Sequence, residues 1–100
     1  MIVKSFRGRK VPLYIQTKSQ LIAWALLIAK KDKQPITNGE FAFTLRCLRY
    51  GGIIHNLRQQ GWVIKTIQGK ARGEFSFELT YVPPVKTMRS QYALIVKKGR

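Results

Sequence analysis

Acidic residues are scarce in this sequence, which has four Asp and Glu against 19 Lys and Arg and a net charge of +15 over 100 residues. A folded domain with this imbalance repels itself unless it meets a polyanion, and nucleic acid is the commonest polyanion. The four acids, Asp32, Glu40, Glu74 and Glu78, are scattered along the chain. A domain this small has no room for a cleft with a pair of catalytic carboxylates. The charge therefore favours nucleic-acid binding over glycoside hydrolysis.

Cysteine and histidine occur once each, as Cys47 and His55. A single cysteine excludes a disulfide within the chain, and so few ligands cannot complete a zinc site. As a nucleophile and its base, the two residues would also need an orienting acid, and none lies near them in the sequence. We therefore expect no metal, no cofactor and no enzymatic activity.

Long apolar runs are missing as well, since the longest spans residues 21–29. A membrane-spanning helix needs about 20 such residues. The first 15 residues lack the apolar core of a signal peptide because Lys4, Arg7, Arg9 and Lys10 interrupt them. We expect a cytoplasmic protein without a membrane partner.

Hydrophobic residues nevertheless make up 45% of the chain, which excludes a wholly disordered polycation and fits a single domain.

The first predicted helix starts at a capping box formed by Thr17 and Gln20. Apolar residues then recur at helical spacing, at Leu21, Trp24, Ala25 and Ile28. Other apolar residues between them indicate that this helix is covered on more than one side. Lysines favour its C-terminal end, and Pro35 terminates it.

A second capping box, Thr37 with Glu40, starts a helix that continues through Leu45 or as far as Leu48. A third helix runs from about residue 48 to residue 60, and Gly61 closes it. Its inward positions are Tyr50, Ile54 and Leu57, and its outward positions are Arg49, Gly52, Asn56 and Gln59.

The apolar period then changes from helical to two, which predicts strands at residues 62–67 and 75–81. The glycine-bounded turn between them, residues 69–73, carries Lys70 and Arg72. We expect a further short strand at Tyr92–Val96. Residues Val11–Ile15 are another candidate, which Pro12 would confine to a sheet edge.

Three helices followed by a hairpin with a basic tip is the element order of a winged helix-turn-helix. Residues 36–64 resemble the small winged-helix domains of phage and prophage DNA-binding proteins. In that family a Thr-capped helix leads to a turn, a helix ending in Ile-x-x-Leu-Arg-x-x-Gly, and a wing. The most specific matching piece is Ile54-His55-Asn56-Leu57-Arg58-Gln59-Gln60-Gly61-Trp62. The resemblance covers about residues 17–81.

Two features depart from this family. Gly51 and Gly52 fall within its recognition helix, where two adjacent glycines cost roughly 2 kcal/mol relative to alanine. Ile53 stands where a basic residue is frequent. The resemblance places the turn near Arg46-Cys47-Leu48, whereas helix propensity alone places it at Gly51-Gly52. We adopt the first placement.

The charge distribution predicts a basic arm at each end, and the resemblance implies an α+β fold, a winged helix-turn-helix of three helices and a hairpin wing. It divides the chain into an N-terminal arm or edge strand (1–16), the winged-helix domain (17–82) and a C-terminal tail or strand (83–100). Duplex DNA is the expected partner, for transcription control, replication or recombination in a phage or mobile element. The candidate DNA contacts are Arg46, Arg49, Gly52, Asn56 and Gln59 on the recognition helix and turn, Lys70 and Arg72 on the wing, and Arg7, Arg9, Lys10, Lys97, Lys98 and Arg100 on the arms.

Two other functions remain open at this point. The same charge could steer the domain to an acidic host protein. A binder of single-stranded DNA or RNA would need exposed aromatic residues on a basic surface, and most of the 11 aromatics fall at predicted inward positions. A homodimer also remains open.

Overall fold

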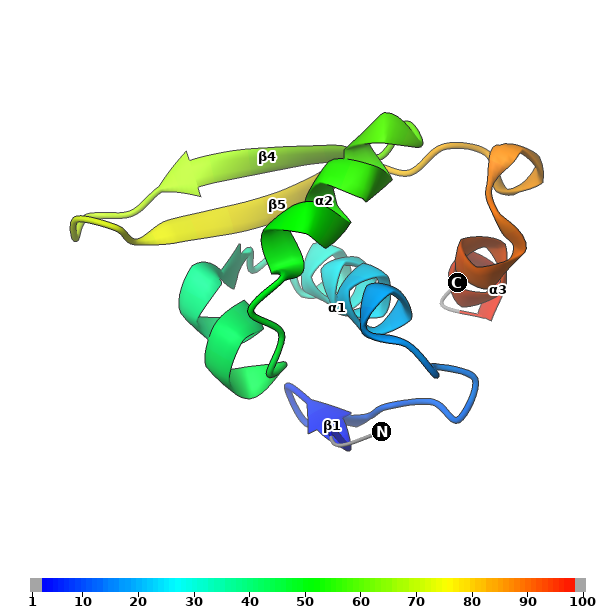
Figure 1. Ribbon diagram of the computed structural model, residues 1–100, viewed down its shortest axis with the longest axis horizontal. Coiled ribbons are helices and arrows are strands. Elements are labelled where there is room, and N and C mark those ends of the chain that lie inside the picture. The colour runs from blue at the N-terminus through cyan, green and yellow to red at the C-terminus, as the bar shows by residue number, and fades with distance from the viewer. Residues whose placement is uncertain (1–2, 99–100) are drawn as a thin grey trace.

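Helices and short antiparallel sheets alternate along the chain in an α+β arrangement (Figure 1). The computed structural model describes residues 3–98. In chain order the elements are β1 (Ser5–Phe6), β2 (Arg9–Lys10), α1 (Lys18–Asp32), β3 (Ile36–Thr37), the π-helical segment η1 (Glu40–Thr44), α2 (Tyr50–Gln59), β4 (Val63–Gln68), β5 (Phe75–Tyr81), the 3-10 turn η2 (Val85–Thr87) and α3 (Ser90–Lys98). The hairpin of β4 and β5 projects at one end of the longest dimension, and α3 lies at the other end (Figure 1).

Helix α1 forms the centre of the core. Its capping box is present as predicted, because the Thr17 hydroxyl accepts from the Gln20 amide at 3.1 Å and the Gln20 side chain accepts from the Thr17 amide at 3.1 Å. The helix is buried on several sides, since Leu21, Ile22 and Leu26 are all fully enclosed. It contacts β5, α2 and α3, so the main sheet and two other helices pack against it.

The main sheet has the strand order β3-β5-β4 and is antiparallel throughout. The predicted hairpin is confirmed, and its register places Lys65 opposite Glu78. Strand β3 is an addition to the sequence-based expectation, and its Ile36 pairs with Phe77. This third strand ties the start of η1 to the hairpin.

The turn before α2 lies where the resemblance placed it. The capping box of Thr37 and Glu40 is formed, but the helix it starts is short, since η1 ends at Thr44. The chain then turns through Arg46, whose φ of +51° lies in the left-handed region. Helix α2 begins at Tyr50, so both Gly51 and Gly52 belong to its first turn and neither forms the turn itself.

The C-terminal end of α2 is a Schellman motif. The Trp62 amide donates to the Leu57 carbonyl at 3.1 Å, and the Gly61 amide donates to the Arg58 carbonyl at 3.1 Å. Gly61 has a φ of +99°, a conformation that strains any residue with a Cβ. The predicted role of Gly61 as the C-terminal glycine is confirmed.

Gly52→Ala is expected to raise the free energy of unfolding by up to about 1 kcal/mol, because alanine favours the helix. Outside the neighbouring helix backbone, a Cβ at Gly52 would meet no atom within 4 Å, so the change introduces no clash. Thermal unfolding measures the effect. The matched control is Gly61→Ala, which should lower the melting temperature because of the positive φ. A clear drop for Gly52→Ala would mean that Gly52 is not helical.

Both terminal segments differ from the expected strands. The predicted strand at Val11–Ile15 is absent, and the N-terminal strands are β1 and β2, joined by a tight turn in which Arg7 and Gly8 both have positive φ. The segment Tyr92–Val96 is helical, not extended. Its buried residues, Tyr92, Ile95 and Val96, have the helical spacing i, i+3, i+4 and pack as part of the core.

Candidate nucleic-acid interface

The turn that precedes α2 is lined by basic residues. Arg46 and Arg49 are exposed there, and together with Lys18 from the start of α1 they border a hollow of about 390 Å³. The Lys18 ammonium donates to the carbonyl oxygens of Leu45 at 3.2 Å and Arg46 at 3.0 Å. Lys18 thus holds the turn in shape, a role that only the contact between α1 and the turn reveals.

The exposed face of α2 is polar and carries no carboxylate. Gly52, Asn56 and Gln59 are exposed as predicted, and His55 is exposed beside them. Residues 50–59 contain no Asp or Glu, so this face does not repel a polyanion. His55 was not among the predicted contacts, although its position one residue before Asn56 already placed it near the outward face.

An aromatic cluster fixes the orientation of α2. The Tyr50 ring stacks on Phe41 of η1 with centroids 5.0 Å apart, and both rings pack against Phe77 of β5 at 5.8 and 5.6 Å. Ile54 and Leu57 are buried beneath the helix. The predicted inward positions are therefore confirmed, and they turn the polar positions outward.

The exposed side chain of Arg58 connects α2 to the hairpin. Its guanidinium donates to the Ile64 carbonyl from Nε at 3.1 Å and from Nη2 at 2.6 Å, and to the Thr66 hydroxyl at 3.0 Å. These hydrogen bonds fix β4 relative to α2. Although Arg58 is a cation next to the candidate contacts, its donors are largely used within the protein.

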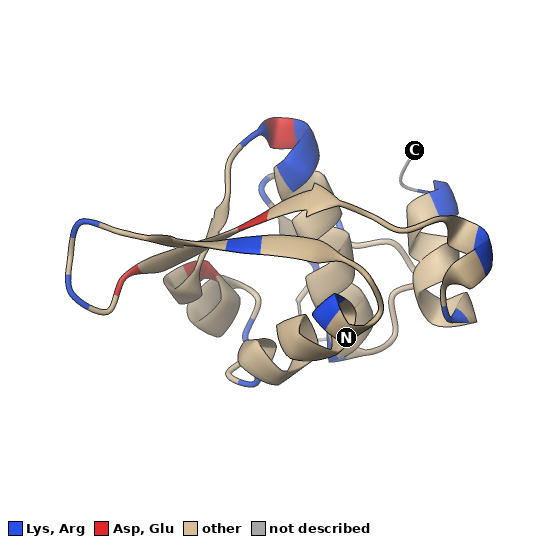
Figure 2. Cartoon of the chain, turned by 90° about the horizontal axis from the view of Figure 1, so that it is seen from above, with Lys and Arg blue, Asp and Glu red and all other residues tan. Residues whose placement is uncertain are grey.

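Lys70 and Arg72 are exposed at the hairpin tip. Figure 2 shows basic positions at the tip of the projecting hairpin. A positive φ of 81° at Gly73 shapes the tip. Asn38 anchors it, since its side-chain amide donates to the Gly73 carbonyl at 2.8 Å and its carbonyl oxygen accepts from the Phe75 amide at 3.3 Å. Sequence reasoning missed this role of Asn38. The tip is therefore held against the start of η1.

Two of the predicted arm residues have carboxylate partners within the protein. The Arg7 guanidinium pairs with Glu40 at 2.9 Å and donates to the carbonyl oxygens of Gln34 and Pro35 at 2.8 and 3.1 Å. Arg9 pairs with Asp32 at 2.9 Å. These ion pairs make Arg7 and Arg9 poorer candidates for phosphate contacts than the sequence suggested.

The remaining arm residues are distributed over β2 and α3. Lys10 and Lys97 are exposed, and the Lys98 ammonium lies 5.9 Å from the centre of the Tyr14 ring. Burial raises the pKa of the Tyr14 phenol, so this ring stays neutral at physiological pH. Arg100 lies outside the described residues.

Comparisons with known proteins supply no family for this chain. No protein-family model matches it. No curated protein and no solved structure gives a significant match either. Among residues 3–98, no helix has the length and apolar character needed to cross a membrane.

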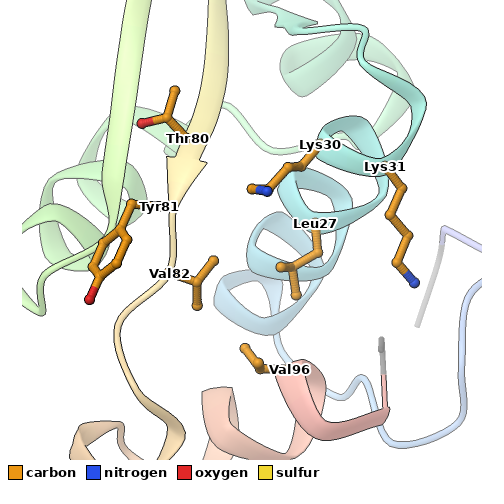
Figure 3. A pocket seen from close by; sticks show the side chains of 7 residues that line it. All are labelled: Leu27, Lys30, Lys31, Thr80, Tyr81, Val82 and Val96. Atoms are coloured by element: carbon orange, nitrogen blue, oxygen red, sulfur yellow. The ribbon is translucent and has the colours of Figure 1, made fainter.

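Another hollow, of about 340 Å³, lies between the end of α1, the end of β5 and α3 (Figure 3). Its walls include Leu27, Val82 and Val96, and Lys30 extends from α1 towards β5. Its titratable groups are lysines and a tyrosine, without a carboxylate, a histidine or a thiol. It shares no residue with the basic turn, the exposed face of α2 or the hairpin tip.

Proposed function

We propose that this chain is a winged-helix protein that binds duplex DNA through α2 and the tip of the β4–β5 hairpin. The observation that carries the proposal is the acid-free polar face of α2, which directly follows an exposed basic turn in the chain and is followed by a hairpin with an exposed basic tip. The order α1, η1, α2, β4, β5 agrees with the family resemblance of residues 17–81. A net charge of +15 supplies the long-range attraction to the phosphate backbone.

In this proposal α2 enters the major groove. Asn56 and Gln59 carry the amides that pair with adenine edges, and Arg49 carries a guanidinium that can bind guanine. Gly52 has no side chain, so the helix backbone can approach the bases closely. Lys70 and Arg72 contact the phosphate backbone beside the groove. The protein would act in transcription control, replication or recombination.

Mobility shifts with duplex DNA, single-stranded DNA and RNA of the same sequence test this function. We expect the duplex to bind most tightly at equal salt. Among the described aromatic residues only Phe43, Phe75 and Tyr81 are exposed, which gives a single strand few rings on which to stack. Preference for a single strand would reject the proposal.

Binding of an acidic host protein is a second candidate, and one observation favours it. Phe43 and Leu48, both 81% exposed, lie on either side of Arg46 in the sequence. Exposed apolar side chains beside a cation suit a protein partner with apolar and acidic residues. Failure of the chain to bind any nucleic acid in the mobility shifts would favour this candidate.

The double variant Lys70→Ala with Arg72→Ala should weaken binding to all duplexes about equally. Each lost phosphate contact makes the dependence of log K on log salt shallower by about one unit, so the slope should change by about two units. Fluorescence anisotropy over a salt series measures it. Lys30→Ala with Lys86→Ala removes the same charge from exposed sites on α1 and η2 and should leave the slope nearly unchanged. Loss of binding to one sequence only would mean that the hairpin tip reads bases.

A further inference from the structure

A small polar pocket lies where α2 ends and the segment leading into α3 passes beside it. Its volume is about 240 Å³, and it is lined by Asn56, Gln59, Gln60 and Arg89. Organic ligands usually occupy sites of about 300–1,000 Å³ with mostly apolar walls. This pocket is smaller and lined by polar residues, so it suits a compact polar group.

The lining offers hydrogen-bond donors and no negative charge. The Arg89 guanidinium has five N–H groups and each carboxamide has two, which is the donor set that recognises phosphate oxygens. One amide atom of Gln60, assigned as Oε1, is buried and has no hydrogen-bond partner among residues 3–98. Because this atom is buried, the donors that a ligand in the pocket can reach are those of Arg89, Asn56 and Gln59.

The pocket is continuous with the face proposed to contact DNA, because Asn56 and Gln59 belong to both. Arg89 is brought there by α3. The Tyr92 and Ala93 amides donate to the Arg89 carbonyl at 3.0 Å each, and Tyr92 packs edge-on against Trp62 with centroids 6.1 Å apart. The backbone of Arg89 is thereby fixed next to the C-terminal end of α2.

We infer that this pocket binds one phosphate of the duplex backbone at the edge of the groove that α2 enters, an inference that rests on the proposed function. Asn56 and Gln59 then contact DNA at the boundary between base edges and backbone, and Arg89 supplies the charge. The C-terminal segment becomes part of the DNA-binding surface through a residue that the sequence did not single out. A free phosphate ion presents the same chemistry and is the second source of ligand to be tested.

Arg89→Ala should weaken binding to every duplex about eightfold at 0.1 M salt and make the salt slope shallower by about 0.9, the effect of one phosphate. Lys86→Ala is the matched control, because it removes the same charge from an exposed residue three positions earlier that does not line the pocket. It should change affinity less than twofold. Arg89→Lys keeps the charge and should restore most of the slope.

Equal effects of Arg89→Ala and Lys86→Ala, with tight duplex binding by the wild type, would overturn the pocket and leave the proposed function standing. Absence of duplex binding by the wild type would overturn both. Side-chain amide resonances of Asn56, Gln59 and Gln60 give a second measurement that needs no variant. They should shift on adding a 12-base-pair duplex, and more weakly with inorganic phosphate. Resonances that stay in place with the duplex would overturn the pocket, and equal shifts with millimolar phosphate alone would assign it to the free ion.

Discussion

Raising the salt concentration from 50 to 200 mM should weaken duplex binding by two to three orders of magnitude. If about five phosphates are neutralised, log K falls with log salt at a slope near −4 to −5, because each contact releases condensed counterions. We expect the exposed cations Arg46, Lys70, Arg72 and Arg89 to make most of these contacts. Anisotropy titrations at four or more salt concentrations give the slope directly.

Two results would contradict this expectation. Binding that is undetectable at 50 mM salt would reject a duplex-binding function. Binding that is tight but nearly independent of salt would mean that contacts other than phosphate dominate the affinity. A duplex of scrambled sequence serves as the control, since its slope should be similar even where its affinity is lower.

Arg7→Ala should lower the free energy of unfolding by about 2–3 kcal/mol, because it breaks a partly buried ion pair and leaves the Glu40 carboxylate without its partner. The side chains of Arg7 and Glu40 are only 17% and 28% exposed. Without Arg7, Glu40 and the carbonyl oxygens of Gln34 and Pro35 lose a shared donor. For a chain of this size the melting temperature should fall by roughly 10–20 °C.

Arg9→Ala provides the matched control on the same short hairpin. It removes the same charge, but the Arg9 side chain is 44% exposed and its pair with Asp32 lies at the surface. Exposed pairs contribute about 0–1 kcal/mol. Equal losses of stability in the two variants would show that the Arg7–Glu40 contact has no special role. A large loss of DNA affinity in folded Arg7→Ala would mean that Arg7 contacts DNA, as the sequence predicts.

Local signals explain the parts of the fold that the sequence predicted. A capping box such as Thr17 with Gln20 involves residues three apart, and Gly61 acts on its own helix end. The alternation in β4 and β5 is likewise a property of short segments. The residues that indicate each of these elements lie within or next to it in the sequence, so each element could be predicted without knowledge of the others.

The elements that were missed depend on contacts distant in sequence. Strand β3 has two residues, and it exists because Ile36 pairs with Phe77 across the core. Helix α3 spans nine residues, a length at which a short apolar segment fits either a helix or a strand. Residues 92–96 are all apolar and fit both periods, and packing against α1 and Trp62 selects the helix.

The candidate site also contains residues that local patterns predict and residues whose role depends on distant contacts. Helical periodicity was enough to place Asn56 and Gln59 on the exposed face of α2. It could not reveal that Arg7 pairs with Glu40, 33 residues away, or that Arg58 donates hydrogen bonds to β4. Charge alone treats all these cations as equivalent, whereas the fold separates those with internal partners from those facing solvent.

The hydrogen bonds of Arg58 to β4 would also have a consequence for the DNA in the proposed complex. Arg58 and the ring of Tyr50 against Phe77 join α2 to the strands of the hairpin, and these contacts favour one fixed orientation of the two parts. If the chain binds duplex DNA as proposed, a fixed pair of contact elements would not follow a groove of varying width, so the duplex would have to adjust by bending or by changing its groove dimensions. Flexible pyrimidine–purine steps make that adjustment easily and stiff A-tracts resist it. Base pairs that the protein never touches would then help to decide where it binds.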